Sequence, residues 1–142
     1  MSNSDNPGNG AEFQKQVFEW FSRRYNSSFE LEKVIEIGEP KTGHKYDIAN
    51  EDNTMVIECK RYTWTESGNS PSAKLGVLNE AAFFLSYLPV DCEKYIVMAK
   101  AIHPSRDESL AEYYYRRYKH LLIPKNIKLA EFDTEKETLK VF

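Results

Sequence analysis

The sequence predicts an α/β fold in which a central mixed β-sheet is flanked by helices. Segments with helical spacing of apolar residues alternate along the chain with short strand-like runs, and this alternation is typical of layered α/β folds. The chain has 142 residues, 41% apolar and 29% charged, which suits one globular domain. We therefore divide it into a disordered tail over residues 1–10, which is polar and rich in Gly and Asn, and a single domain over residues 11–142.

The composition argues against several classes of protein. The longest apolar runs, such as residues 81–85, are too short to cross a membrane, and the polar N-terminus lacks the pattern of a signal peptide, so we expect a cytoplasmic protein. Cys59 and Cys92 form no CxxC pair, which favours two reduced, buried thiols over a disulfide or a zinc site. The formal net charge of −3 disfavours a strongly basic nucleic-acid binder, although phosphate contact needs only a local basic face.

The N-terminal half predicts one helix and three strands. Phe13, Val17, Trp20 and Phe21 recur at intervals of three and four, as along one side of a helix over residues 10–25. A loop containing Gly and Pro then separates a first strand from two alternating runs joined by polar residues, which is the pattern of a β-hairpin. The expected strands cover residues 33–37, 44–49 and 54–60, with the loop at 38–43 and the hairpin turn at 50–53.

The C-terminal half predicts two helices, each followed by at least one strand. The first of these helices has a regular apolar face and is closed by Pro89, and Ser70 or Ser72 is expected to cap its start. The second has acidic residues at its start and basic residues near its end, which match the helix dipole. The expected helices cover residues 73–88 and 107–122, and the expected strands cover residues 95–99, 127–132 and 138–142.

Three residues of the expected hairpin carry the chemistry. Glu58 and Lys60 lie two apart on one strand, so their side chains point to the same face. If the turn holds two or four residues, Asp47 pairs with Val56 and joins that face. The Asp47 and Glu58 backbones are then diagonal neighbours, roughly 7–8 Å apart, within side-chain reach of a common ion.

This arrangement indicates metal-dependent hydrolysis of a phosphodiester. Two carboxylates that converge on one point repel each other unless a cation lies between them. Mg²⁺ accepts one or two carboxylates together with waters and phosphate oxygens, and it can activate bound water. A neighbouring lysine orients the attacking water and offsets charge on the phosphate. Glu58 and Lys60 alone would suit an exposed ion pair, but the strand around them is apolar, where unpaired charge is costly.

Asp47, followed by ten residues and then Glu58-Cys59-Lys60, resembles the motif of the PD-(D/E)XK nuclease superfamily, which includes restriction endonucleases, Mrr-type enzymes and Holliday-junction resolvases. The expected element order, αβββαβαβ, is also similar to its restriction endonuclease-like core, so the resemblance extends over most of the chain. It implies that Asp47 and Glu58 bind Mg²⁺, with Mn²⁺ as a substitute, and that Lys60 serves catalysis. It also implies that the backbone carbonyl of Cys59 completes the metal shell.

The resemblance further implies a third acidic group from the first helix. Glu12 is the best-placed candidate and Glu19 the second, although a glutamate in a first turn equally complements the helix dipole. Two positions depart from the superfamily's pattern. Tyr46 stands where the motif has proline, and Asn79 stands where some subfamilies carry glutamine, so the subfamily stays open.

Several residues outside the hairpin are candidates for contacting nucleic acid. Arg61 and Lys74 flank the proposed site along the chain and are expected to contact phosphates. Tyrosines at positions 113–115 and 118 suit base stacking or a dimer surface, and at least one of them must belong to the core. Trp64 either inserts into a bent duplex or, as is commoner, covers the edge of the core.

The sequence therefore predicts an Mg²⁺-dependent endonuclease that acts on DNA, with RNA as an alternative substrate and no small-molecule cofactor. Cutting a duplex or resolving a junction needs two cuts and one chain offers one site, so a homodimer is expected. The alternative from another class is a nuclease-fold module that binds nucleic acid or a protein partner without turnover. The acidic net charge supports that alternative.

Overall fold

The computed structural model describes residues 7–142. Its elements are the helices α1 (Pro7–Arg24), α2 (Ser72–Leu85) and α3 (Leu110–Leu122), a short 3₁₀ helix η2 (Ile123–Lys125), and the strands β1 (Phe29–Ile37), β2 (Thr42–Asn50), β3 (Met55–Lys60), β4 (Glu93–Ala99), β5 (Ile127–Asp133) and β6 (Thr138–Val141). Residues 7–10, expected in the tail, belong to α1, and the expectation for residues 1–6 lies outside the described part of the chain.

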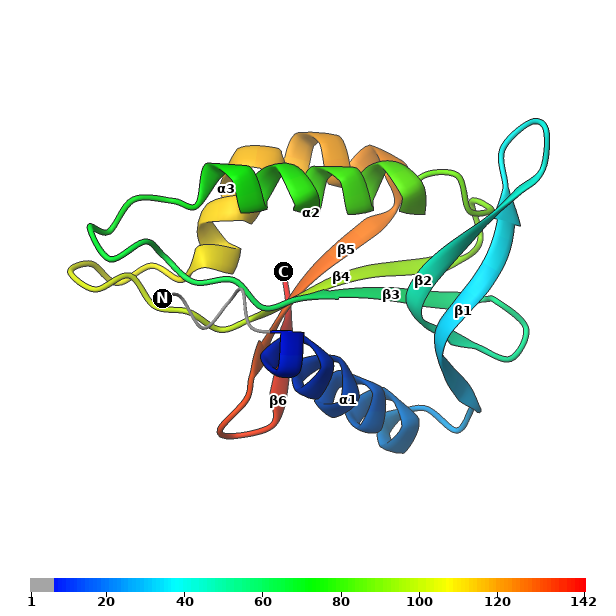
Figure 1. Ribbon diagram of the computed structural model, residues 1–142, viewed down its shortest axis with the longest axis horizontal. Helices are drawn as coiled ribbons and strands as arrows, with labels where there is room; N and C mark the ends of the chain where they lie inside the picture. The colour runs from blue at the N-terminus through cyan, green and yellow to red at the C-terminus, as the bar shows by residue number, and fades with distance from the viewer. Residues whose placement is uncertain (1–6) are drawn as a thin grey trace.

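The six strands form one mixed sheet in the order β1-β2-β3-β4-β5-β6. The two central pairings, β3 with β4 and β4 with β5, are parallel, and the three others are antiparallel. Each parallel pairing is bridged by one helix, first α2 and then α3. Because such crossovers are right-handed, successive ones in the same direction place both helices on one face of the sheet, as Figure 1 shows. The expected mixed sheet flanked by helices is confirmed.

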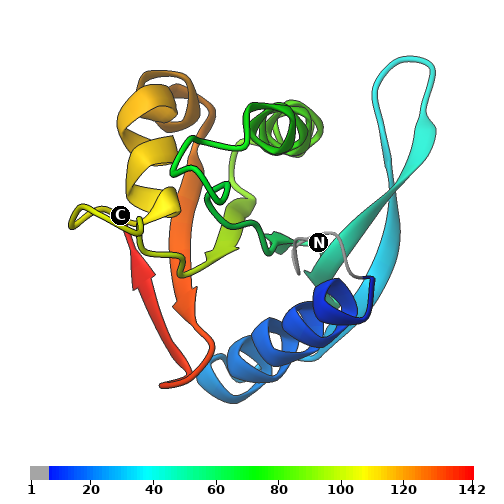
Figure 2. The same cartoon turned by 60° about the vertical axis from the view of Figure 1, so that its left-hand side comes forward.

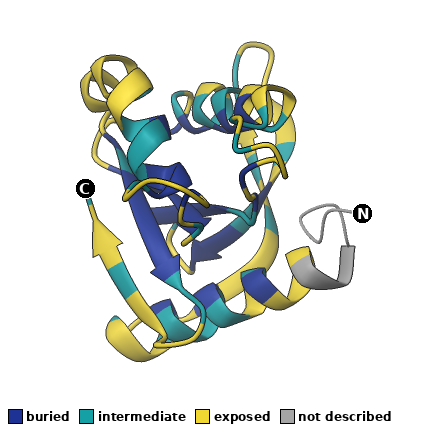
Figure 3. Cartoon of the chain, turned by 90° about the vertical axis from the view of Figure 1, so that its left-hand side faces the viewer, coloured by how far each residue is buried: buried dark blue, intermediate teal, exposed yellow. Residues whose placement is uncertain are grey.

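Two hydrophobic cores lie on the two faces of the sheet. On the α1 face, Phe13, Val17 and Phe21 pack against the central strands, so the predicted apolar side of the first helix is confirmed. On the α2–α3 face, leucines of α2 meet Tyr114 of α3 over β3 and β4. Figure 2 shows α1 on its own side of the sheet, and Figure 3 shows the central strands buried between exposed outer surfaces.

The helix boundaries differ from the expected ones where local hydrogen bonds decide them. Ser109 begins α3, because its side chain accepts the N–H of Glu112 while the Glu112 carboxylate accepts the N–H of Ser109. This capping box satisfies two N–H groups, and Asp107, the expected start, stays outside the helix. Helix α2 follows Pro71 and has no side-chain cap, so the expected serine cap is wrong. Among residues 7–142, no helix is both long and apolar enough to span a bilayer.

Candidate metal-binding and catalytic site

Strands β2 and β3 pair in a register two residues away from the expected one. Val56 lies opposite Ala49, and Ile57 lies opposite Ile48, so the expected pairing of Val56 with Asp47 is wrong. The turn is wider because the buried Asn50 side chain folds inward and its Oδ1 accepts the backbone N–H of Met55 at 2.9 Å. A shift of two residues preserves which face each side chain occupies. Asp47 therefore still shares the face of Glu58, and it has become the direct neighbour of Glu58 instead of a diagonal one.

The two carboxylates cross between the strands at the point where the β2–β3 ladder ends. The backbone N–H of Cys59 donates to Oδ2 of Asp47 at 2.8 Å, and the backbone N–H of Asp47 donates to Oε1 of Glu58 at 3.3 Å. Each carboxylate thus accepts an N–H from the neighbouring strand. These reciprocal bonds hold the two acidic groups side by side on the α2–α3 face.

A bend in β2 is centred on Asp47. Tyr46 belongs to the core on the α2–α3 face and Ile48 to the core on the α1 face, although residues two apart on a regular strand share a face. Across the ladder, Glu32 interrupts the β1 pairing between Leu31 and Lys33 and has a φ of +52°. A left-handed conformation is unfavourable for a residue with a side chain, at about 1–2 kcal/mol. Backbone strain is therefore stored opposite the candidate site.

Tyr46 fixes this bend against α2. Its fully buried hydroxyl donates to the backbone carbonyl of Phe84 at 2.7 Å, which ties the residue before Asp47 to the last turn of α2. This contact gives a structural role to the position where the superfamily motif has proline. Tyr46 thus helps to set the position of the Asp47 backbone.

Replacing Tyr46 by phenylalanine is expected to lower the free energy of unfolding by about 0.5–1.5 kcal/mol, because the buried hydrogen bond to Phe84 is lost. Urea denaturation followed by circular dichroism measures the change. Tyr87→Phe is the matched control, since Tyr87 is 52% exposed and its hydroxyl should contribute little. Equal stability of the two variants would contradict the anchoring role of Tyr46.

The electrostatics of the pair favour a bound cation. Burial raises the pKa of Glu58 well above its ordinary value, and the neighbouring Asp47 carboxylate raises it further, while Lys60 opposes the shift. Glu58 is 6% exposed and Lys60 is half-buried. One lysine therefore does not offset both the desolvation and the mutual repulsion of two carboxylates. Hard oxygen donors that need positive charge are the ligand set that Mg²⁺ prefers.

Without a divalent metal, the free energy of unfolding is expected to fall as the pH rises above the ordinary carboxyl value of 4.5. The folded state holds a proton on Glu58 that the unfolded state releases. This contribution is therefore fully present below the unfolded pKa and is lost as the pH rises through the raised folded pKa. Thermal melts between about pH 5 and 9 in EDTA measure it. Mg²⁺ should reduce this loss of stability. Stability should depend less on pH in Glu58→Gln than in the wild-type protein. The same slope in both proteins would refute the assignment of the pH dependence to Glu58.

The structure does not bring Glu12 to the carboxylate pair. Its side chain is exposed on α1, and the described residues contain no group of three or more His, Cys, Asp or Glu side chains suited to a metal. Glu12 and Glu19 thus join no such group among the residues described, and the metal-ligand role of either stays a prediction. The residue of α1 that reaches the site is Gln14, whose Nε2 donates to the backbone carbonyl of Asp47 at 3.4 Å. Sequence reasoning missed Gln14 because it considered only acidic residues.

Cys59 points its side chain away from the pair. Its thiol lies in the core on the α1 face, and burial raises its pKa well above the ordinary value, so it stays a neutral thiol. Its backbone lies beside Asp47, as the hydrogen bond to Oδ2 shows. The carbonyl oxygen of Cys59 is thus the group that could serve a metal, as the resemblance implies.

The two residues expected to contact phosphate lie where β3 ends and α2 begins. Arg61 follows Lys60 directly and is half-buried. The ammonium of Lys74, in the first turns of α2, lies 5.5 Å from the centre of the Tyr62 ring. Tyr62 is two residues from Lys60, so Arg61 and Lys74 both lie near the end of the site that Lys60 occupies.

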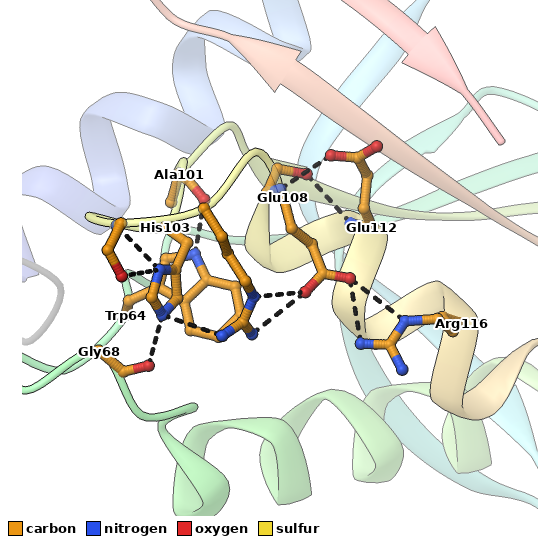
Figure 4. Close-up of polar contacts among 10 residues, drawn as sticks. Trp64, Gly68, Ala101, His103, Glu108, Glu112 and Arg116 are labelled. Carbon is orange, nitrogen blue, oxygen red and sulfur yellow. Dashed lines mark hydrogen bonds and ion pairs between the residues drawn. The ribbon is translucent and has the colours of Figure 1, made fainter.

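The loops that follow the parallel strands β3 and β4 contact each other through hydrogen bonds and ring packing (Figure 4). Trp64 is 8% exposed, and its Nε1 donates to the carbonyl of Ala101 at 2.9 Å. The His103 ring lies against Trp64, and its Nε2 is 2.7 Å from the carbonyl oxygen of Gly68. The buried Trp64 ring covers the edge of the core, as the commoner alternative predicts, and does not project as a wedge.

A cluster of charged residues connects the same loops with α3. The Glu108 carboxylate binds the guanidinium groups of Arg106 and Arg116 at 3.2 and 3.1 Å. Arg106 also lies over the Trp64 ring, with its guanidinium carbon 5.0 Å from the ring centre. Arg106 and Arg116 thus share one carboxylate partner within the chain.

Asn79 connects the two helices of this face. Its Oδ1 accepts the hydroxyl of the buried Tyr114 at 2.9 Å. The position that carries glutamine in some subfamilies therefore serves helix packing in this chain.

Comparison with known proteins finds no match, neither with a protein-family model nor with a curated protein nor with a solved structure.

Proposed function

We propose that this chain is a metal-dependent endonuclease that hydrolyses DNA phosphodiester bonds at Asp47, Glu58 and Lys60. The observation that carries the proposal is the crossed, partly buried carboxylate pair with a lysine on the same face. A buried glutamate next to a second carboxylate destabilises a fold, so a pair kept in this position favours a functional role. The PD-(D/E)XK spacing and the mixed sheet support the same assignment.

Asp47 and Glu58 would hold Mg²⁺ or Mn²⁺, with the carbonyl of Cys59 as a further oxygen donor. When bound, such an ion supplies a Lewis acid and lowers the pKa of water. Lys60 orients the attacking water by hydrogen bonding and stabilises negative charge that develops on the phosphate oxygens. Arg61 and Lys74 bind neighbouring phosphates and keep the strand in place.

The remaining site residues act by positioning. Gln14 holds the Asp47 carbonyl from the α1 side, and Tyr46 anchors the bend from the α2 side. Orientation within a fraction of an ångström decides the rate of such a reaction. A homodimer would supply the second cut that a duplex needs.

A second candidate is a nuclease-fold module that binds nucleic acid or a protein without cutting. Two observations favour it: both carboxylates already accept backbone N–H groups, and no third His, Cys, Asp or Glu joins them among the residues described. In that case the pair would serve to end the β2–β3 ladder.

The test is cleavage by the full chain. Plasmid, linear, single-stranded and branched DNA, together with an RNA of matched sequence, are incubated with Mg²⁺, Mn²⁺ or EDTA. We expect cutting of DNA that needs the metal and stops in EDTA. Calorimetric titration with Mn²⁺ is run in parallel, because the module predicts neither metal binding at Asp47 and Glu58 nor cutting. A folded protein that binds no metal and cuts no substrate would overturn the proposal.

A further inference from the structure

A hollow next to the candidate site is lined by aromatic rings. It has a volume of about 560 Å³ and lies between the outer ends of β1 and β2 and the last turn of α2, where it is bordered by Phe83, Phe84, Tyr87 and His44. This volume falls within the ordinary range of small-ligand pockets, about 300–1,000 Å³. Figure 1 shows the β1–β2 arm rising beside the end of α2. The hollow thus lies on the same side of the sheet as Asp47 and Glu58.

The rings of this hollow form a partly completed stack. The His44 and Phe84 rings are parallel, with an angle of 8° between their planes and 3.8 Å between their centres. Phe83 meets Phe84 and Tyr87 edge to face. Phe83 is 58% exposed and Tyr87 is 52% exposed, so ring surface is left for a planar ligand. Aromatic faces that are open to solvent are what nucleobases stack on.

The hollow and the carboxylate pair share strand β2, which contributes His44 to the hollow and Asp47 to the pair. His44 lies three residues before Asp47, about 10 Å along an extended strand. Burial lowers the pKa of His44, and the Glu80 and Asp47 carboxylates oppose that shift. His44 is therefore within electrostatic reach of the site. A DNA strand with one phosphate bound at Asp47 would place its adjacent nucleotides at about the distance of His44 and the hollow.

The charge of the hollow suits a base and not a phosphate. Among the described residues that line it, Glu39 is the one carboxylate, and there is no lysine or arginine. A carboxylate repels phosphate but accepts hydrogen bonds from exocyclic amino groups, such as N4 of cytosine. The lining thus combines stacking surface with an acceptor for a base edge.

We propose that this hollow is a nucleobase pocket, in which a base next to the bound phosphodiester leaves its own stack and inserts against Phe83 and Tyr87 beside His44. The inference rests on the proposed function for the identity of the strand. It goes beyond that function by assigning base recognition to the β1–β2 arm and the end of α2. Enzymes that bind an unstacked base are most selective where the base is unpaired or weakly paired, so single-stranded or junction DNA is the expected substrate class.

The experiment uses the full chain carrying Lys60→Ala, so that bound DNA is cut much more slowly in Mg²⁺ during the binding measurement. Oligonucleotides, single-stranded and duplex, carry 2-aminopurine at successive positions, and binding is followed by fluorescence anisotropy. We expect the 2-aminopurine fluorescence to change at one position. Adding Phe83→Leu, which keeps an apolar side chain but removes the ring, should abolish that change and weaken binding by about 5- to 150-fold, as for one lost stacking contact.

Leu121→Ala is the matched control, because Leu121 is 57% exposed and borders a different hollow on the other side of Phe83. It should leave both signals unchanged. Fluorescence that is the same at every position, binding that does not depend on Phe83, or no DNA binding at all would overturn the pocket. The pocket would also be overturned if Phe83→Leu changed only the oligomeric mass of the DNA-free protein and not DNA binding. That result would show that a second copy of the chain occupies the hollow.

The two proposals fail separately. A wild-type chain that cuts DNA with no dependence on Phe83 retains the nuclease and overturns the pocket. A chain that gives the position-specific fluorescence change but cuts no DNA retains the pocket and overturns the nuclease.

Discussion

Replacing Glu58 by glutamine is expected to abolish cleavage while making the fold more stable. Glutamine keeps an oxygen that can accept the N–H of Asp47, but it removes the charge that a metal needs. Cleavage should fall by at least about 100-fold, since even outer partners of metal ligands are worth 10- to 100-fold. The free energy of unfolding should rise by about 0.5–2 kcal/mol at neutral pH, because glutamine is neutral without the proton uptake by which the folded wild-type chain neutralises Glu58.

The comparison is made at neutral pH in EDTA for stability and in Mg²⁺ for activity. Glu131→Gln is the matched control. Glu131 is 7% exposed on β5 and is not part of the carboxylate pair, so its replacement should leave cleavage unchanged. An active Glu58→Gln enzyme would remove Glu58 from the metal site. A variant that loses activity and stability together would instead favour a purely structural pair.

The faces of the hairpin could be predicted from the sequence because alternation alone decides them. Glu58 and Lys60 are separated by one residue, and any even shift of the turn leaves Asp47 on their side. The register could not be predicted, because it depends on where the Asn50 side chain turns. That side chain folds into the protein and widens the loop, which no local pattern of polar residues indicates.

The bend at Asp47 could not be predicted from the sequence either. It depends on Glu32 in a left-handed conformation across the ladder and on the hydroxyl of Tyr46 bound to α2. Glutamate has no particular preference for that conformation, so tertiary contacts impose it. Local rules therefore predict where the strands run, and contacts between distant segments decide how the acidic groups meet.

The position of Glu12 relative to the carboxylate pair could not be predicted for a similar reason. Periodicity correctly placed Phe13, Val17 and Phe21 against the sheet. It did not determine which flank of α1 faces β2, because that depends on how the helix crosses the strands. Gln14 occupies that flank and Glu12 is exposed. The resemblance directed attention to acidic residues, so the neighbouring amide of Gln14 was not considered.

Replacing Lys60 by alanine is expected to lower the single-turnover rate of cleavage by about 10²- to 10³-fold, the usual effect of removing one group that stabilises developing charge. Metal affinity should be retained, because Asp47 and Glu58 remain. The substitution removes from the surroundings of Glu58 a positive charge that repels the metal, so Glu58 should bind the cation at least as well. The rate is measured by quenched flow and the affinity by calorimetry with Mn²⁺.

Lys100→Ala distinguishes this role from a general loss of positive charge. Lys100 follows the end of the neighbouring parallel strand and pairs with Asp133 at 3.9 Å, so it is a lysine in a comparable position whose acidic partner is not part of the Asp47–Glu58 pair. Its replacement should weaken DNA binding slightly at low salt and leave the rate of the bound complex unchanged. Similar rate losses in both variants would indicate that Lys60 only attracts DNA. A rate loss confined to Lys60→Ala, with metal still bound, would separate catalysis from binding at this site.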